Sequence, residues 1–325
     1  MDVPTPEPAP NEAVIAVERV GLCGSDVHLY IGDHPYSQYP RIQGHEFSGL
    51  VAELPESYTG RLRIGDRVAV EPLVACGACY ACLRDRPNCC EHLAVIGAHR
   101  DGALRDQINV DVKTVYPVGD LDAELAALVE PVSIGCQAVE RGMIGPKDRI
   151  VVYGAGPIGQ AVMLAARSKG AEVMVVDLLS SRRELALFLG AEAVADGASE
   201  HLDRTIKDWT NGSGPGVIVD ATGVPRVVQR AFEQVAHSGR VVLVGISVEH
   251  LSVPLNDYIR KELTVYGSRN NAGVFRDAIE LVRAHRDRIR SLITHRFSLE
   301  EIQEALELAA NHPDKTEKVI VEVGP

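Results

Sequence analysis

The chain has 325 residues, 46% of them hydrophobic, and a formal net charge of −12. This length predicts about two domains, each able to bury a core. Lys and Arg form no block, which argues against a nucleic acid or an anionic membrane as partner, and no stretch is long and apolar enough to span a bilayer.

The first part of the chain predicts a β-rich domain. Residues 1–11 are proline-rich and indicate an extended lead-in, without the basic and apolar regions of a signal peptide. Short apolar runs bounded by turn residues predict strands at 14–20, 47–54 and 67–70. No helical period occurs before about residue 120, which favours a small barrel-like fold.

After residue 122 the pattern changes to alternating strands and helices, which is typical of a doubly wound parallel sheet. The predicted strands are 149–153, 172–176, 217–219 and 241–244, and the predicted helices are 157–168 and 180–189. The tail adds helices at 274–284 and 299–308 and a last strand at 318–323, which could return to the first domain. We therefore predict an α/β chain with one domain at 1–132, completed by 269–325, and another at 133–268.

A metal site is predicted at Gly44-His45-Glu46. An imidazole beside a carboxylate, after a glycine that permits a sharp turn, offers two ligands that zinc takes. The triplet alone is better explained by a surface His-Glu pair in a turn. Cys23 upstream, the cysteine-rich loop and a dinucleotide motif downstream favour the metal.

The cysteine-rich loop predicts a second, structural zinc site in a lobe at residues 71–95. Cys76, Cys79, Cys82 and Cys90 follow the spacing C-x2-C-x2-C-x7-C, and four thiolates close a tetrahedral shell. Spacing alone leaves Cys89 open as the fourth ligand. The seven cysteines of the chain indicate metal binding or reactive thiols in a cytoplasmic protein, with Cys136 a core thiol.

A dinucleotide loop follows the predicted strand at 149–153. Gly154 permits a tight turn, Gly156 lets a pyrophosphate approach the backbone, and Gly159 lets helix and strand pack closely. The helix that opens at Pro157 and Ile158 offers free N–H groups to the phosphates.

Asp177 ends the following strand, where a carboxylate accepts hydrogen bonds from a ribose diol and favours NAD over NADP. Arg182 and Arg183 close by weaken that preference. Thr222 and Val244 follow two further apolar strands, where they could line the nicotinamide or simply end the strands.

With these motifs in place, the chain resembles the medium-chain zinc-dependent alcohol dehydrogenases, and within them the sorbitol, polyol and sugar-acid (galactonate-type) branch. The matching stretches are 21–26, 44–46, the cysteine loop, 128–131 and 154–159. The resemblance implies a GroES-like catalytic domain and a Rossmann domain with the active site in the cleft between them. It also implies one catalytic Zn2+, one structural Zn2+ and NAD.

The resemblance assigns roles in the metal sites by position. It implies that Cys23 and His45 bind the catalytic zinc, with Glu46 as a direct ligand and Glu130 as a ligand of zinc or of a zinc-bound water. Which carboxylate is the third ligand stays open. Cys90, rather than Cys89, matches the fourth structural ligand.

The resemblance also implies the reaction. Zinc acidifies an alcohol, which gives hydride to C4 of NAD+. Ser25 matches the hydroxyl that takes the substrate proton and His28 its outlet to solvent, although His28 is equally explained as a surface residue.

The branch favours a polyol or a sugar acid as the small-molecule substrate, and an L-threonine 3-dehydrogenase-like enzyme is the alternative. Arg269 is a candidate cofactor contact that could also grip a carboxylate. Further candidate substrate contacts are Tyr30, Tyr36, Tyr39, Asn270 and Asn271.

One departure from the family is a strand pair expected before the proline-rich segment, which this chain starts too late to contain. Its loss would expose a sheet edge. A truncated NAD- and zinc-binding relative with little catalytic activity is therefore a second hypothesis. By analogy we expect a homodimer or homotetramer.

Overall fold

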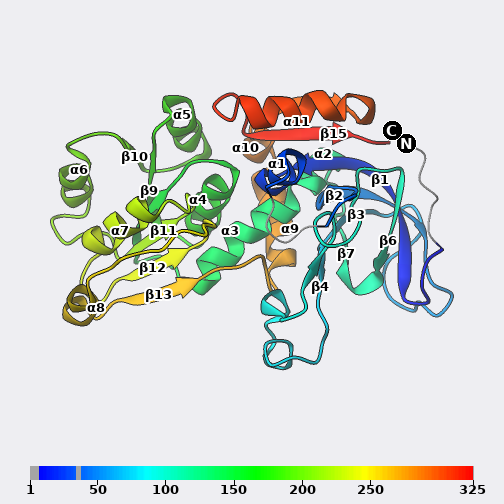
Figure 1. Ribbon diagram of the computed structural model, residues 1–325, viewed down its shortest axis with the longest axis horizontal. Coiled ribbons are helices and arrows are strands. Elements are labelled where there is room, and N and C mark those ends of the chain that lie inside the picture. The colour runs from blue at the N-terminus through cyan, green and yellow to red at the C-terminus, as the bar shows by residue number, and fades with distance from the viewer. Residues whose placement is uncertain (1–6, 34–37, 325) are drawn as a thin grey trace. The chain divides into compact units, whose positions relative to one another are not determined.

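The computed structural model describes residues 7–33 and 38–324, which form two compact units (Figure 1). Unit 1 comprises Met1–Glu130 and Phe275–Pro325, and unit 2 comprises Pro131–Val274. Tyr36 and the first six residues of the proline-rich lead-in lie outside the described residues. Within the part that is described, no helix has the length and apolarity needed to cross a membrane.

Unit 1 is built on a sheet whose described strands run in the order β14-β15-β1-β2-β3-β7, with β6 also paired to β1. The strands are β1 (Glu12–Leu22), β2 (Glu46–Glu53), β3 (Arg67–Val70), β6 (Gln107–Asp111), β7 (Val115–Pro117), β14 (Ile293–Ser298) and β15 (Lys318–Glu322).

The central strand β1 pairs with neighbours along both of its edges and is buried along most of its length. Its consecutive buried residues point to both faces of the sheet, which explains the imperfect alternation of its sequence, and Ile15, Val17 and Val20 anchor the core of the unit. Strand β15 runs antiparallel beside the end of β1 (Figure 1). The prediction that the last strand returns to the first domain is therefore confirmed.

The helices of unit 1 include one that the sequence pattern did not predict. The helices are α1 (Gly24–Ile31), α2 (Ala123–Ala127), α9 (Phe275–Ala284), α10 (Arg286–Arg290) and α11 (Ile302–Asn311). The expectation that no helix precedes residue 120 is wrong because α1 buries only Asp26 and Leu29, which is too few positions to give a helical period. Capping starts it instead, since the Asp26 carboxylate accepts a hydrogen bond from the Cys23 N–H at 2.9 Å.

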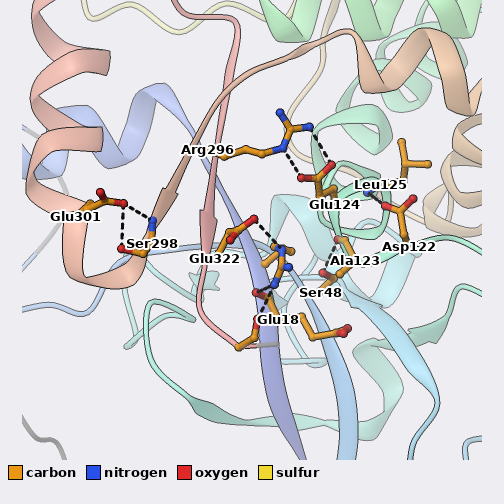
Figure 2. Close-up of polar contacts among 12 residues, drawn as sticks. Glu18, Ser48, Asp122, Ala123, Glu124, Leu125, Arg296, Ser298, Glu301 and Glu322 are labelled. Atoms are coloured by element: carbon orange, nitrogen blue, oxygen red, sulfur yellow. Dashed lines mark hydrogen bonds and ion pairs between the residues drawn. The ribbon is translucent and has the colours of Figure 1, made fainter.

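Polar contacts attach the C-terminal segment of unit 1 to its N-terminal part (Figure 2). Arg296 on β14 binds both carboxylate oxygens of Glu124 on α2, at 2.5 and 3.0 Å. The buried Ser48 hydroxyl on β2 donates to the carbonyl oxygen of Ala123 at 2.6 Å, so α2 is fixed from both sides.

Unit 2 is a parallel sheet in the order β10-β9-β8-β11-β12-β13, which confirms the doubly wound architecture. Its strands are β8 (Arg149–Tyr153), β9 (Glu172–Asp177), β10 (Ala193–Asp196), β11 (Val217–Asp220), β12 (Arg240–Leu243) and β13 (Thr264–Gly267). The helices in this part of the chain are α3 (Val129–Arg141), α4 (Pro157–Ser168), α5 (Ser180–Leu189), α6 (Leu202–Trp209), α7 (Pro225–Gln234) and α8 (Leu255–Lys261).

Candidate metal centres and dinucleotide site

Three metal-ligating side chains of unit 1 meet where β1 ends and β2 begins. Cys23 follows β1 as the N-cap of α1, and His45 and Glu46 open β2. One ligand atom from each lies within 4.8 Å of the others. Gly44 makes the approach possible, because its φ is +96° and a Cβ there would lie 2.8 Å from a methyl group of Val20. A thiolate, an imidazole and a carboxylate at this separation fit zinc.

Asp26 supports this group, although the sequence reasoning gave it no role. Its fully buried carboxylate accepts hydrogen bonds from the N–H groups of Cys23 at 2.9 Å and Gly44 at 3.3 Å, and it lies 3.7 Å from Nδ1 of His45. Burial lowers the pKa of His45, but Asp26, Cys23 and Glu130 together outweigh it and leave that pKa well above its ordinary value. Asp26 therefore orients the ring of a candidate metal ligand.

Lys318 is a second supporting residue that the sequence reasoning missed. Its Nζ donates to the two carboxylate oxygens of Glu46 at 2.8 and 2.6 Å and to the carbonyl oxygen of Leu22 at 3.1 Å. Lys318 is 3% exposed and Glu46 fully buried. Burial lowers the pKa of Lys318, but Glu46, Cys23 and Glu130 together outweigh it and the net shift is upward.

Glu130 lies in the first turn of α3 and is buried. Burial raises its pKa to about 7, while His45 acts in the opposite direction. It is not part of the group of three ligand atoms within 4.8 Å of one another, whereas Glu46 is.

The two candidate proton carriers lie on α1. Ser25 is half-buried near the start of the helix, directly before the buried Asp26. His28 is exposed, and its Nδ1 lies 2.9 Å from a carboxylate oxygen of Asp33. The position of His28 at the surface suits a proton outlet and an ordinary surface histidine alike.

The cysteine-rich loop lies between the short strands β4 (Leu73–Val74) and β5 (Ala94–Val95). The ligand atoms of four thiols lie within 4.8 Å of one another, namely those of Cys76, Cys79, Cys82 and Cys90. Cys89 is exposed and not part of this group.

Backbone N–H groups point at these sulfurs. The Sγ atom of Cys90 accepts hydrogen bonds from the N–H groups of Cys76 and His92, both at 3.3 Å. Backbone N–H groups lower the pKa of Cys79 to about 6, whereas burial raises the pKa of its neighbour Cys82 to about 12. Four convergent sulfurs with N–H donors around them fit a closed structural zinc site.

In unit 2 the glycine-rich turn joins β8 to α4 as predicted. Gly154 has a φ of +90°. A Cβ at Gly159 would lie 1.8 Å from the carbonyl oxygen of Gly154, so only glycine fits there. Pro157 starts the helix, with Ile158 in its first turn, which leaves the helix N-terminus open to phosphates.

Asp177 ends β9 beside this turn. One of its carboxylate oxygens accepts a hydrogen bond from the Ala155 N–H at 2.7 Å and the other from the Leu179 N–H at 2.9 Å. Arg183 donates hydrogen bonds to the carbonyl oxygens of Asp177 and Leu178 and so stabilises the turn after β9. A Cβ at Gly156 would lie 3.7 Å from the guanidinium of Arg182, so that positive charge lies next to the turn.

Three further predicted contacts follow the carboxyl ends of parallel strands. The Thr222 hydroxyl donates to a carboxylate oxygen of Asp220 at 2.6 Å and so belongs to the turn after β11. Val244 directly follows β12, and the exposed Arg269 follows β13. The fully buried Asn271 has neither amide atom hydrogen-bonded within the described residues.

Comparison with known proteins covers both units. Residues 9–120 match the model of the alcohol dehydrogenase GroES-like domain, and residues 157–284 match that of the zinc-binding dehydrogenase. L-galactonate-5-dehydrogenase of Escherichia coli K12 is 35% identical over 93% of this chain and 89% of its own length. Sorbitol dehydrogenase of Bacillus subtilis 168 is 34% identical over 98% of this chain and 92% of its own length.

Solved structures agree with these matches. An alcohol dehydrogenase from Escherichia coli CFT073, solved with NADH, has a TM-score of 0.90 and 31% identity, and the match covers 98% of this chain and 94% of that one.

Proposed function

This chain belongs to the zinc-dependent medium-chain alcohol dehydrogenase family, and on that premise we propose that it oxidises a secondary alcohol of a polyol or sugar acid, with NAD+ as the hydride acceptor. The observation that carries the proposal is the convergence of Cys23, His45 and Glu46 on one point in unit 1. The names of the two relatives, a sugar-acid dehydrogenase and a polyol dehydrogenase, support the substrate class.

Cys23 and His45 would hold the catalytic zinc, with Glu46 as the third ligand and Glu130 as its nearby alternative. A zinc ion there would supply Lewis acidity toward the oxygen of a bound alcohol. The Asp26 carboxylate, 3.7 Å from Nδ1 of His45, would support the imidazole electrostatically while it binds the metal.

The proton of the alcohol leaves through the residues of α1. We propose that the Ser25 hydroxyl accepts it and that His28 passes it to solvent. His28 is exposed, and its Nδ1 lies 2.9 Å from a carboxylate oxygen of Asp33, so the imidazole is in contact with solvent.

Unit 2 would hold the dinucleotide. Gly154, Gly156, Pro157, Ile158 and Gly159 would accept the pyrophosphate at the N-terminus of α4. NAD bound in this way supplies the hydride acceptor at C4 of its nicotinamide.

Other residues of unit 2 would set the choice and the orientation of the dinucleotide. The Asp177 carboxylate would accept hydrogen bonds from the ribose diol and repel a 2′-phosphate, which favours NAD. Thr222, Val244 and Arg269 are the proposed contacts beyond the phosphates.

Cys76, Cys79, Cys82 and Cys90 would bind the structural zinc, and that zinc has no part in the reaction. None of the seven cysteines, all of which lie within the described residues, forms a disulfide, which suits a reducing compartment, and we propose the cytoplasm.

We also propose that the protein is a homodimer or homotetramer. Strand β13 forms an edge of the sheet in unit 2, and large apolar side chains are exposed in the segment that joins β12 to β13, namely Ile246 (94%), Val248 (85%), Leu255 (74%) and Ile259 (71%). Large apolar side chains exposed in this way favour association with another copy of the chain. Light scattering at micromolar concentration should give at least a dimer, and a monodisperse monomer would contradict this.

The function is tested by a substrate panel followed through NADH absorbance. We expect turnover of a polyol or sugar acid that stops on adding a chelator and returns with zinc. Turnover of L-threonine in preference to both classes would favour the L-threonine 3-dehydrogenase-like alternative. Tight NADH binding without turnover of any alcohol would instead favour a relative with little catalytic activity.

A further inference from the structure

We propose that Lys318 is a positioning residue of the catalytic zinc site, which holds the Glu46 carboxylate beside Cys23 and His45 and weakens its bond to the metal. The inference rests on the proposed function of that site. Lys318 belongs to the last strand, β15, and lies 272 positions from Glu46 in the sequence.

The contact uses the whole ammonium group. Lys318 donates to both oxygens of Glu46 at 2.8 and 2.6 Å and to the carbonyl oxygen of Leu22 at 3.1 Å, so its three N–H bonds are all engaged. Both side chains are almost fully buried. A pair in this setting is rigid, because neither group has water as an alternative partner.

The sheet builds this contact through its register. β1 lies between β2 and β15, with Gly21 opposite Glu46 and Leu22 opposite Val319. Lys318 precedes Val319 and Cys23 follows Leu22, so the lysine and the thiol are neighbours across two antiparallel strands.

Gly21 leaves the space that the Glu46 carboxylate occupies. A Cβ at position 21 would lie 2.4 Å from Oε2 of Glu46. The carboxylate therefore occupies the space that Gly21 leaves, hydrogen-bonded to the lysine and within 4.8 Å of the ligand atoms of Cys23 and His45.

The charges indicate what the lysine does to the metal. A carboxylate oxygen that accepts one hydrogen bond keeps a second lone pair, so Glu46 can still reach a cation. The ammonium group, however, neutralises the carboxylate and repels a divalent ion. Zinc must then compete with Lys318 for Glu46, which keeps this ligand exchangeable and leaves a coordination position that a substrate oxygen can take.

The test compares the full-length protein with Lys318→Met, which removes the charge and keeps an unbranched side chain, and with Lys318→Arg, which keeps the charge. Zinc affinity is measured by competition with a chromophoric chelator, and ligand geometry from the visible spectrum of the cobalt-substituted catalytic site. We expect Lys318→Met to bind zinc about tenfold more tightly or more and to change the cobalt spectrum. Lys318→Arg should stay closer to the wild type in both measurements.

A double variant isolates the pair. In the Glu46→Gln background, Lys318→Met should raise the zinc affinity less than it does in the wild-type background, because no carboxylate is left to release and only the repulsion between the ammonium group and the ion is removed. If Lys318→Met alone is too unstable to purify, Lys318→Gln takes its place in both backgrounds. An equal increase in zinc affinity in both backgrounds would overturn the proposal. It would also be overturned if Lys318→Met lowered only the melting temperature and left the zinc affinity and the cobalt spectrum as in the wild type.

Failure of this proposal differs from failure of the proposed function. If Cys23→Ser keeps its full zinc content and the wild type oxidises no alcohol, the catalytic site itself is wrong. If Cys23→Ser loses one zinc while Lys318→Met matches the wild type in affinity and spectrum, only the role of Lys318 is wrong.

Discussion

Replacing Cys90 by Ser should remove the structural zinc and open the cysteine-rich loop, whereas Cys89→Ser should do neither. The two residues are adjacent in the sequence, which makes them a matched pair. Cys90 is 3% exposed and belongs to the group of four thiols, while Cys89 is exposed and does not.

The loss of order in the loop should be large, because the interactions of the loop other than zinc binding are few. Ordering residues 76–90 costs about 15–30 kcal/mol of backbone entropy at roughly 1–2 kcal/mol per residue. The buried side chains of the lobe are Leu73, Leu93 and Cys90, which contribute about 5–9 kcal/mol together. Six backbone hydrogen bonds within the loop add about 6 kcal/mol. These terms leave a deficit of about 0–19 kcal/mol, a range that includes the roughly 10–16 kcal/mol that a structural zinc supplies.

The assay is zinc per chain by mass spectrometry, combined with hydrogen exchange of the loop amides. The Cys90→Ser protein should lose one zinc per chain, and the amides of η1 (Cys82–Arg84) and η2 (Pro87–Cys89) should lose protection. The Cys89→Ser protein should match the wild type in both measurements. A Cys90→Ser protein with full zinc and a protected loop would refute the reasoning.

Three further predictions concern the dinucleotide site and acid stability. Gly159→Ala should abolish measurable NADH fluorescence binding, because its Cβ would lie 1.8 Å from the Gly154 carbonyl oxygen; binding as tight as in the wild type would contradict the fit. Asp177→Ser should raise kcat/KM for NADP+ relative to NAD+ by about tenfold or more, and an unchanged ratio would show that this carboxylate does not select the cofactor. The ion pair with Arg296 lowers the pKa of Glu124 below 4.5, so its stabilisation is present above that pH and is lost as the pH falls through the lowered pKa. Urea unfolding should therefore show that Glu124→Gln costs about 1 kcal/mol at neutral pH and much less near pH 3, and an equal cost at both would argue against the ion pair.

The sequence predicted the parts of this protein that are local. The strand, turn and helix around Gly154 depend on residues that are a few positions apart, and Asp177 ends the next strand. This pattern can therefore be predicted from the sequence alone. The four-thiol loop is equally local. By contrast, helix α1 was missed because capping rather than apolar periodicity starts it.

Residues whose task depends on strand register could not be predicted. Nothing near Lys318 in the sequence shows that β15 will lie beside β1 with Glu46 within hydrogen-bond distance. The edge strand β13 was missed for a related reason, since it is short and only partly buried and so lacks the apolar run of the inner strands. Asp26 stands three residues after Cys23, but only the folded turn brings its carboxylate toward His45.

The central claim is that an alcohol held at Cys23, His45 and Glu46 gives its hydride directly to a dinucleotide. The most direct test uses the best substrate of the panel with deuterium on its carbinol carbon, and NAD+ as acceptor. We expect one deuterium at C4 of the NADH formed, with product formation abolished in Cys23→Ser. NADH formed without deuterium, or full turnover by Cys23→Ser, would contradict it.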